Sequence, residues 1–272
     1  MLGVLKKLLG WNAMSPSRKD VVRYKLNSFH ATLACLIPRN ISNIFMCYKS
    51  DKHMPGMHLY GPAYGEFLKP YRYRGIKLLE IGIGGYADSI GGNSLLAWQA
   101  YFPFARIVGC DIQDKRALST RNTRVWRIDQ SSAGDLAELV RAEGPFDIVI
   151  DDGSHLNRHQ IFTFEALFES VSKDGLYVVE DVQTSYWPGQ VGSITWDGAH
   201  IGEPGFPDTC VGYFLDLAKY LNHAEFRSRC GVDDRKLRLA RSIKRIAFEH
   251  NLIFVQKGDN TAPSNLNDIG IS

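Results

Sequence analysis

The feature that most constrains the fold is an apolar run that ends abruptly in charge, the segment FDIVIDDGSH at residues 146–155. Its apolar and β-branched residues are typical of a strand buried on both faces of a parallel sheet. Asp151 and Asp152 follow directly, and His155 comes three residues later. Since ligands bind beyond the carboxyl ends of the strands in open α/β sheets, we expect a functional site here.

A second apolar run, GLYVVED, ends in two further carboxylates, Glu180 and Asp181. If the two strands are neighbours, four carboxylates and a histidine meet at one edge, and crowded carboxyls raise one another's pKa unless a cation neutralises them. We therefore predict that Asp152, Glu180 and Asp181 bind Mg²⁺ or Mn²⁺. Acids that only cap helices would explain one cluster but not both. His155 is the predicted general base, because an unperturbed imidazole has a pKa of about 6.5.

From residue 75 onward, apolar strand-like runs alternate with helical stretches, which predicts a parallel sheet. We predict an α/β fold with a Rossmann-like sheet that is mostly parallel. Two final strands, at 243–249 and 252–257, are joined too closely for a crossover and should pair antiparallel. The predicted organisation is an N-terminal helical or lid extension over 1–70, a core domain over 71–258 with a lid insertion at 183–208, and a flexible tail over 259–272.

The glycine-rich segment EIGIGG follows the first predicted strand and starts at Glu80. Glycines at such a turn, here Gly82, Gly84 and Gly85, let a nucleotide cofactor approach the backbone closely. Asp111 ends the next strand, where a carboxylate can accept hydrogen bonds from ribose hydroxyls. Glu80 would repel a phosphate, which favours a phosphate-free nucleoside cofactor with a cationic sulfonium.

Asp129 and Gln130 end the third predicted strand, where they could bind an adenine edge. An Asp that caps a helix beside a solvated Gln explains the same residues equally well, so both interpretations stay open. Asp151 completes the set of predicted cofactor residues.

The stretch over 183–208 is rich in Gly, Pro and aromatic residues, and we predict a mobile loop there. Tyr186, Trp187 and Trp196 could close over a substrate as a lid. Packing within a long loop is an equally good explanation for these aromatic residues.

The composition narrows the possible partners. A formal net charge of +3 with scattered basic residues argues against nucleic acid. The five cysteines form no CxxC pair and argue for a reducing compartment, so we predict a cytoplasmic protein. Residues 1–11, MLGVLKKLLGW, have an apolar helical face with a cationic edge, which suits either peripheral contact with a membrane or packing on the domain or a partner subunit. We also predict a homo-oligomer.

Three segments, LLEIGIGG, DDGSH and VVEDVQTSYWP, together resemble the metal- and S-adenosylmethionine-dependent sugar O-methyltransferases of the mycinamicin and tetracenomycin rhamnosyl type, within the broader cephalosporin hydroxylase family. The similarity covers about residues 60–188. It implies Mg²⁺ on Asp152, Glu180 and Asp181, His155 as the base, and S-adenosylmethionine over residues 82–85.

The same resemblance implies methylation of a sugar hydroxyl on a glycosylated natural product, glycolipid or polysaccharide, on a class I methyltransferase fold. The kinship with cephalosporin hydroxylase leaves hydroxylation as an alternative activity. A non-catalytic nucleoside-binding subunit is a third possibility, although the two acid clusters argue against it.

Overall fold

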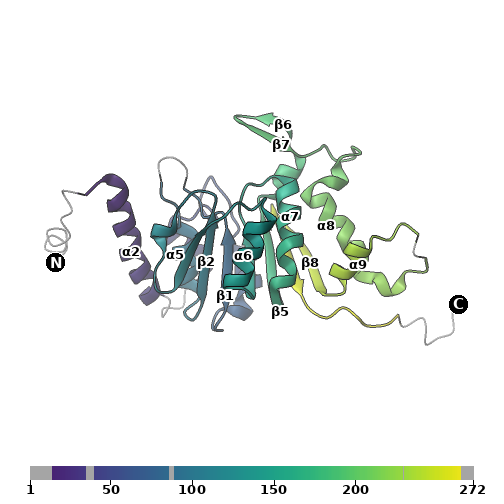
Figure 1. Cartoon of the computed structure of the whole chain (residues 1–272), viewed down its shortest axis with the longest axis horizontal. Coiled ribbons are helices and arrows are strands. Elements are labelled where there is room, and N and C mark those ends of the chain that lie inside the picture. The colour runs from purple at the N-terminus through teal and green to yellow at the C-terminus, as the bar shows by residue number, and fades with distance from the viewer. Residues whose placement is uncertain (1–13, 35–39, 86–88, 229, 265–272) are drawn as a thin grey trace. The chain divides into compact units, whose positions relative to one another are not determined.

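The computed structural model describes residues 14–34, 40–85, 89–228 and 230–264. The predicted amphipathic segment 1–11 lies outside these residues. The chain divides into two compact units, Met1–Ile128 and Asp129–Ser272, and Figure 1 labels some of the helices and strands of each. The domain bounds drawn from the sequence stay a prediction.

The first unit is built from helices around three parallel strands. In chain order its elements are α2 (Pro16–Ala34), α3 (Ile41–Cys47), α4 (Gly61–Leu68), η2 (Lys69–Tyr71), β1 (Lys77–Ile81), α5 (Asn93–Tyr101), β2 (Arg106–Asp111), η3 (Arg116–Leu118) and β3 (Thr123–Arg127). β2 lies between β1 and β3 and pairs with both in parallel. The hydrophobic core includes Trp98 of α5, whose ring meets those of Phe45 and Tyr64 at centroid distances of 5.1 and 5.3 Å.

A buried ion pair links the N-terminal part of this unit to the first strand. Lys52 Nζ lies 3.1 Å from Glu80 Oε1, and the two side chains are 1% and 0% exposed. Ser94 Oγ donates a hydrogen bond to the other carboxylate oxygen at 2.7 Å. Because a buried charge is costly unless it is paired and hydrogen-bonded, Lys52 is needed for Glu80 to be accommodated.

The second unit contains four strands of mixed direction and a separate hairpin. Its elements are α6 (Ala133–Glu143), β4 (Phe146–Asp151), α7 (Asn157–Leu167), η4 (Phe168–Ser170), β5 (Val171–Glu180), η5 (Val182–Tyr186), β6 (Pro188–Val191), β7 (Ile194–Asp197), η6 (Phe206–Asp208), α8 (Cys210–Lys219), η7 (Tyr220–Glu225), α9 (Asp234–Ala240), β8 (Ile243–Glu249) and β9 (Leu252–Lys257). β4 and β5 are parallel, whereas β9 pairs antiparallel with both β5 and β8.

The predicted fold class is confirmed, with parallel strands in both units and an antiparallel pair at the predicted bounds 243–249 and 252–257. The segment 183–208 was predicted to be a mobile loop; the prediction of a loop was wrong for part of it, because β6 and β7 form an antiparallel hairpin. Gly192 and Ser193 make its two-residue turn, and Gly192 adopts a positive φ of 64°. Glycine at the first turn position suits such a hairpin.

No helix among the described residues is long and apolar enough to cross a membrane.

Replacing Lys52 with Met leaves the Glu80 carboxylate buried without its cation, so we expect a loss of about 3–5 kcal/mol in the free energy of unfolding. The double variant Lys52→Met, Glu80→Gln removes both charges and should be more stable than Lys52→Met alone. Urea unfolding measures these differences, with Lys69→Met, at an exposed lysine, as the control. Equal stability of Lys52→Met and the control would contradict a structural role for the pair.

Candidate functional site

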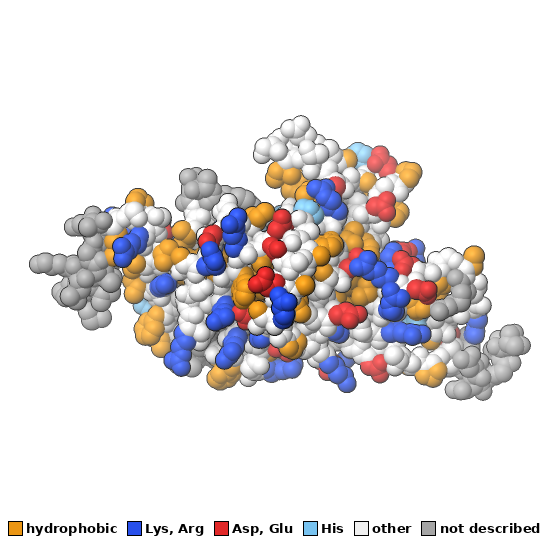
Figure 2. Space-filling view, viewed as in Figure 1, with side chains coloured by type: hydrophobic (Ala, Val, Ile, Leu, Met, Phe, Trp, Pro, Cys, Tyr) orange, Lys and Arg blue, Asp and Glu red, His pale blue; other side chains and the backbone are white. Residues whose placement is uncertain are grey.

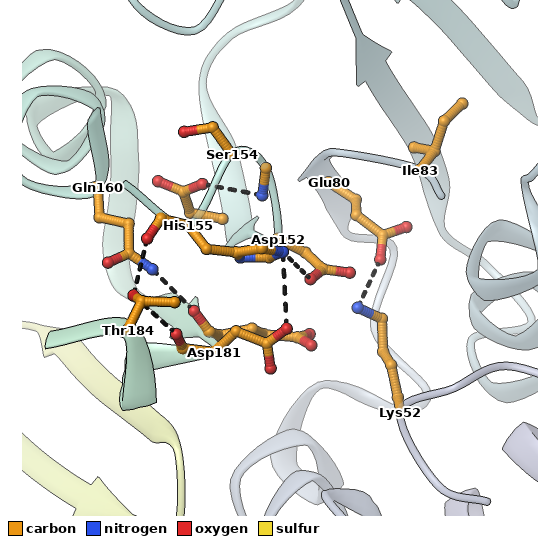
Figure 3. Close-up of polar contacts among 12 residues, drawn as sticks. Lys52, Glu80, Ile83, Asp152, Ser154, His155, Gln160, Asp181 and Thr184 are labelled. Carbon is orange, nitrogen blue, oxygen red and sulfur yellow. Dashed lines mark hydrogen bonds and ion pairs between the residues drawn. The ribbon is translucent and has the colours of Figure 1, made fainter. Parts of the chain in front are cut away.

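Two carboxylates and one imidazole come together at the carboxyl ends of β4 and β5 (Figure 3). Possible ligand atoms of Asp152, His155 and Asp181 all lie within 4.8 Å of one another. His155 Nε2 is 3.9 Å from Asp152 Oδ1 and 3.6 Å from Asp181 Oδ2. Since β4 and β5 are parallel, their ends meet at one edge, and two of the four carboxylates predicted there, Asp152 and Asp181, are grouped with His155.

Unusual backbone conformations bring these side chains together. His155 has a φ of 56° and Asp181 has a φ of 55°, in the left-handed region that residues other than glycine seldom adopt. Thr184 Oγ1 lies 2.7 Å from the carbonyl oxygen of His155 and 3.2 Å from that of Asp181, so its single proton is shared between the two acceptors. One hydroxyl therefore holds both strained residues, and such strain often accompanies a functional site.

Glu180, the third predicted metal ligand, is not among the three residues that the geometry groups. Its side chain is buried, with 1% exposed, and its carbonyl oxygen accepts a hydrogen bond from Gln160 Nε2 at 2.9 Å. His155 was expected only as a base, yet its ring nitrogen lies among the possible ligand atoms. The ligand set Asp152, Glu180 and Asp181 stays a prediction.

Gln130 has a structural role that sequence reasoning missed. Its Nε2 donates to Asp151 Oδ1 at 3.2 Å, and its Oε1 accepts from Ser154 N at 2.6 Å. A Cβ at Gly153 would lie only 2.0 Å from Gln130 Oε1. The amide therefore supports the loop that carries Asp152 and His155, and the predicted adenine contact of Gln130 stays a prediction.

Asp151 and Asp129 also make contacts within the second unit. Asp151 is 0% exposed, and this burial raises the pKa of its carboxyl to about 7. Asp129 Oδ1 accepts hydrogen bonds from the backbone N and the Oγ of Ser131, at 2.8 and 2.6 Å. The helix cap of α6 is Ser132, whose Oγ accepts from Asp135 N. Asp129 thus forms a turn before the helix, and cofactor contacts of Asp129 and Asp151 stay predictions.

The glycine loop in the first unit has the backbone freedom that the sequence predicts. Gly82, Gly84 and Gly85 adopt φ values of 78°, 62° and 83°. A Cβ built on Gly84 would meet no atom within 4 Å, whereas one on Gly85 would lie 2.3 Å from Gly91 N. Glycine is thus required at Gly85 for the chain to fold back on itself, and the backbone at Gly84 is openly accessible.

Asp111 is held beside this loop by a lysine that the sequence argument did not include. Lys115 Nζ lies 2.7 Å from Asp111 Oδ2, donates to the carbonyl oxygen of Gly85 at 3.2 Å, and also contacts that of Gly84. Asp111 Oδ2 further accepts from Ile83 N at 3.4 Å. The carboxylate is therefore next to the glycine loop, as a ribose-binding role requires.

The structure weakens one step of the cofactor prediction. The preference for a phosphate-free cofactor assumed that Glu80 carries an uncompensated negative charge. Lys52 balances that charge inside the unit, so Glu80 gives no reason of its own to exclude a phosphate.

The three predicted lid aromatics pack with one another and with their neighbours. The ring centroids of Trp187 and Trp196 are 5.6 Å apart, and those of Tyr186 and Phe206 are 5.4 Å apart. Tyr186 and Trp187 are nevertheless 44% and 40% exposed. Asp197, at the end of β7, accepts a hydrogen bond from Asn157 N at 2.8 Å, which ties the hairpin to α7. Packing accounts for part of this aromatic cluster, and closure as a lid stays a prediction.

His159, one turn into α7, stabilises the same loop through Ser154. Its Nδ1 lies 2.8 Å from Ser154 Oγ. Burial, together with the charge of Arg158, lowers the pKa of this imidazole from its usual value. The folded state therefore favours the neutral form of the His159 imidazole.

The lowered pKa of His159 predicts that the free energy of unfolding depends on pH. Below the unfolded-state pKa of about 6.5, the unfolded chain binds a proton that the folded chain resists, so the free energy of unfolding should fall as pH falls through and below that value. In His159→Gln this decline should be shallower. Urea unfolding between pH 7.5 and 5, values chosen to span about 6.5, measures the slopes, with the exposed His200→Gln as the control. Identical slopes in wild type and His159→Gln would contradict this role.

Comparison with known proteins defines the class of this fold and its relatives. No family model matches the chain. The fold is that of a class I methyltransferase: the solved structure of the MycE methyltransferase from the mycinamycin biosynthetic pathway, in complex with Mg and SAH, matches with a TM-score of 0.73 and 36% identity. The match covers 83% of this chain and 56% of that one.

The relatives by sequence are sugar O-methyltransferases. The chain is 38% identical over 222 residues to 8-demethyl-8-alpha-L-rhamnosyl tetracenomycin-C 2'-O-methyltransferase of Streptomyces olivaceus, covering 81% of this chain and 55% of the relative. It is 39% identical over 207 residues to mycinamicin VI 2''-O-methyltransferase of Micromonospora griseorubida, covering 75% and 49%. The resemblance seen in the sequence is thereby confirmed, and the chain spans about half the length of these curated relatives.

Proposed function

We propose that this chain is an S-adenosylmethionine- and Mg²⁺-dependent O-methyltransferase acting on a sugar hydroxyl of a glycosylated natural product, glycolipid or polysaccharide. The observation that supports this most directly is the group of Asp152, His155 and Asp181 in a chain 39% identical to mycinamicin VI 2''-O-methyltransferase. A second solved structure of MycE contains Mg, SAH and mycinamycin VI. We take the acceptor to be a small-molecule glycoside or glycolipid, and we retain the predictions of no nucleic-acid partner, a homo-oligomer and a cytoplasmic location.

The residues at the strand ends suit a hard divalent cation. Asp152 and Asp181 offer carboxylate oxygens, which Mg²⁺ and Mn²⁺ prefer. Glu180 is the third ligand in our proposal, and three carboxylates leave positions of an octahedron open for water and substrate. The cation supplies Lewis acidity, which lowers the pKa of a neighbouring sugar hydroxyl.

The glycine loop and its carboxylate suit the nucleoside part of the methyl donor. We assign Gly82, Gly84 and Gly85 to close backbone approach, because their positive φ values form a turn with open space at Gly84. Asp111 would accept hydrogen bonds from ribose hydroxyls. Asp129, Gln130, Asp151 and Glu80 complete the proposed set of cofactor residues. The donor supplies a methyl group on a sulfonium.

His155 is the proposed general base. As the sugar oxygen bonds to the methyl carbon and the carbon–sulfur bond breaks, His155 takes the hydroxyl proton and later releases it to solvent. His155 Nε2 lies 3.6 Å from Asp181 Oδ2 and 3.9 Å from Asp152 Oδ1, which places the base beside the proposed metal ligands. The imidazole Nδ1 is buried and has no hydrogen-bond partner among the described residues.

The aromatic cluster is the proposed cover of the acceptor. Tyr186 and Trp187 expose large ring surfaces, and the hairpin that carries Trp196 is a small element attached to α7 through Asp197. Closure of these rings over a sugar would exclude water from the transfer step.

Activity measurements separate the role of His155 from binding. With labelled S-adenosylmethionine, Mg²⁺ and a panel of rhamnosides and other deoxysugar conjugates, the wild type should form a product heavier by CH₂. His155→Ala should lower kcat by about 10²- to 10⁴-fold, because general base catalysis contributes that much. Its calorimetric affinity for S-adenosylmethionine should stay near that of wild type. A product heavier by one oxygen would instead support hydroxylation. If His155→Ala lost affinity for S-adenosylmethionine by as large a factor as it lost kcat, His155 would have a structural role.

Metal binding can be followed without turnover. Titration with Mn²⁺, detected by electron paramagnetic resonance, should show one site in the wild type. Asp152→Asn and Asp181→Asn should each weaken it by at least about tenfold, since even loss of a residue that supports a ligand costs about 10- to 100-fold. Asp208→Asn, at an exposed carboxylate in η6, is the control. Glu180→Gln tests the third ligand. Unchanged Mn²⁺ affinity in Asp152→Asn, Asp181→Asn and Glu180→Gln would show that the metal does not bind at this site.

A further inference from the structure

Helix α2 has two distinct apolar faces. The inner face packs within the first unit through the buried Tyr24, Ser28 and Ala31, and Ser28 Oγ donates a 2.6 Å hydrogen bond to Gln99 Oε1 of α5. On the outer face three large apolar side chains stay in solvent: Leu26 is 40% exposed, Phe29 is 63% exposed and Leu33 is 52% exposed. A contiguous row of exposed apolar side chains marks a surface that can bind another molecule.

The outer residues form a continuous strip along the helix. Leu26, Phe29 and Leu33 follow the half-buried Val22 at spacings of four, three and four residues. At about 100° per residue, all four lie within an arc of about 60°. The same rotation places the buried Tyr24 and Ala31 on the opposite side, so this apolar strip points away from the packed core of the unit.

Positive charge flanks the apolar strip on both sides. By the same helical rotation, Arg18 and Lys25 border one side, and Lys19 and Arg23 border the other. The one acidic residue of α2, Asp20, pairs with Arg23 Nη1 at 3.1 Å. In Figure 2, hydrophobic and Lys or Arg side chains lie next to one another in the region of α2.

A basic hollow adjoins the strip. It has a volume of about 630 Å³ and is lined from α2 by Lys25, Ser28, Phe29 and Thr32. The segment 119–122, which contains Arg121, forms its other wall with hydroxyl and amide side chains. Two cations beside hydroxyl groups suit an anionic head group, and Phe29 belongs to both the hollow and the strip.

We propose that the outer face of α2 binds the surface of an anionic lipid bilayer, with the strip in the interface and the hollow near the head groups. A row of apolar residues between two rows of Lys and Arg is the pattern of helices that lie in a membrane interface. Charge complementarity favours this partner over a second copy of the chain, because pairing two α2 strips would bring together two helices in which Lys and Arg exceed Asp by three.

Vesicle co-sedimentation of the full chain tests this proposal independently of the methyltransferase activity. The wild type should bind vesicles of phosphatidylcholine and phosphatidylserine, bind pure phosphatidylcholine less, and lose binding as salt rises. Phe29→Ser with Leu33→Ser should weaken binding to the mixed vesicles by at least about tenfold. Lys25→Glu should also weaken vesicle binding, through charge alone. This variant tests the proposal even if circular dichroism shows that the apolar double variant does not fold.

The matched control is Phe104→Ser with Leu59→Ser, which removes two apolar side chains of the same unit that are 64% and 66% exposed. It should bind like the wild type. Equal binding of both vesicle types by the wild type, or wild-type binding by the α2 variants, would overturn the proposal. A concentration-dependent dimer in analytical ultracentrifugation that Phe29→Ser with Leu33→Ser abolishes, without vesicle binding, would make the strip a subunit interface instead.

Discussion

The parallel pairing of β4 with β5 is the constraint on which the candidate site depends. Asp151 of β4 is in register with Val179 of β5, so the acidic residues that follow each strand must emerge at the same edge. Like charges held so close repel one another, and burial would make this worse. The fold tolerates the arrangement by leaving Asp152 and Asp181 partly accessible and by placing the His155 imidazole between them.

Acidic residues elsewhere in the structure are accommodated differently. In the first unit, Glu80 is compensated by Lys52 and Asp111 by Lys115, so each carboxylate is paired with a lysine. In the second unit, possible ligand atoms of Asp152, His155 and Asp181 lie within 4.8 Å of one another. That grouping is why we assign a bound cation to the second unit.

Strand positions were predictable because local pattern determines them. The runs at 77–81, 106–111 and 252–257 coincide with mostly buried strands, where burial leaves little freedom in residue choice. The strand at 243–249 is mostly exposed or half-buried, and its short connection to 252–257 made it predictable. The convergence of Asp152 with Asp181 followed from the same logic. Partners distant in sequence could not be predicted: nothing near Glu80 indicates Lys52, and nothing near Gln130 indicates that its amide supports the loop at Gly153 and Ser154. The hairpin of β6 and β7 was missed because its residues are exposed and lack an apolar alternation.

The central claim is that the ends of β4 and β5 hold a divalent cation, and an anomalous difference map from crystals soaked in Mn²⁺ tests it most directly. The account predicts one strong peak about 2.0–2.2 Å from carboxylate oxygens of both Asp152 and Asp181. A map with no peak there, or with its strongest peak at other residues, would contradict it.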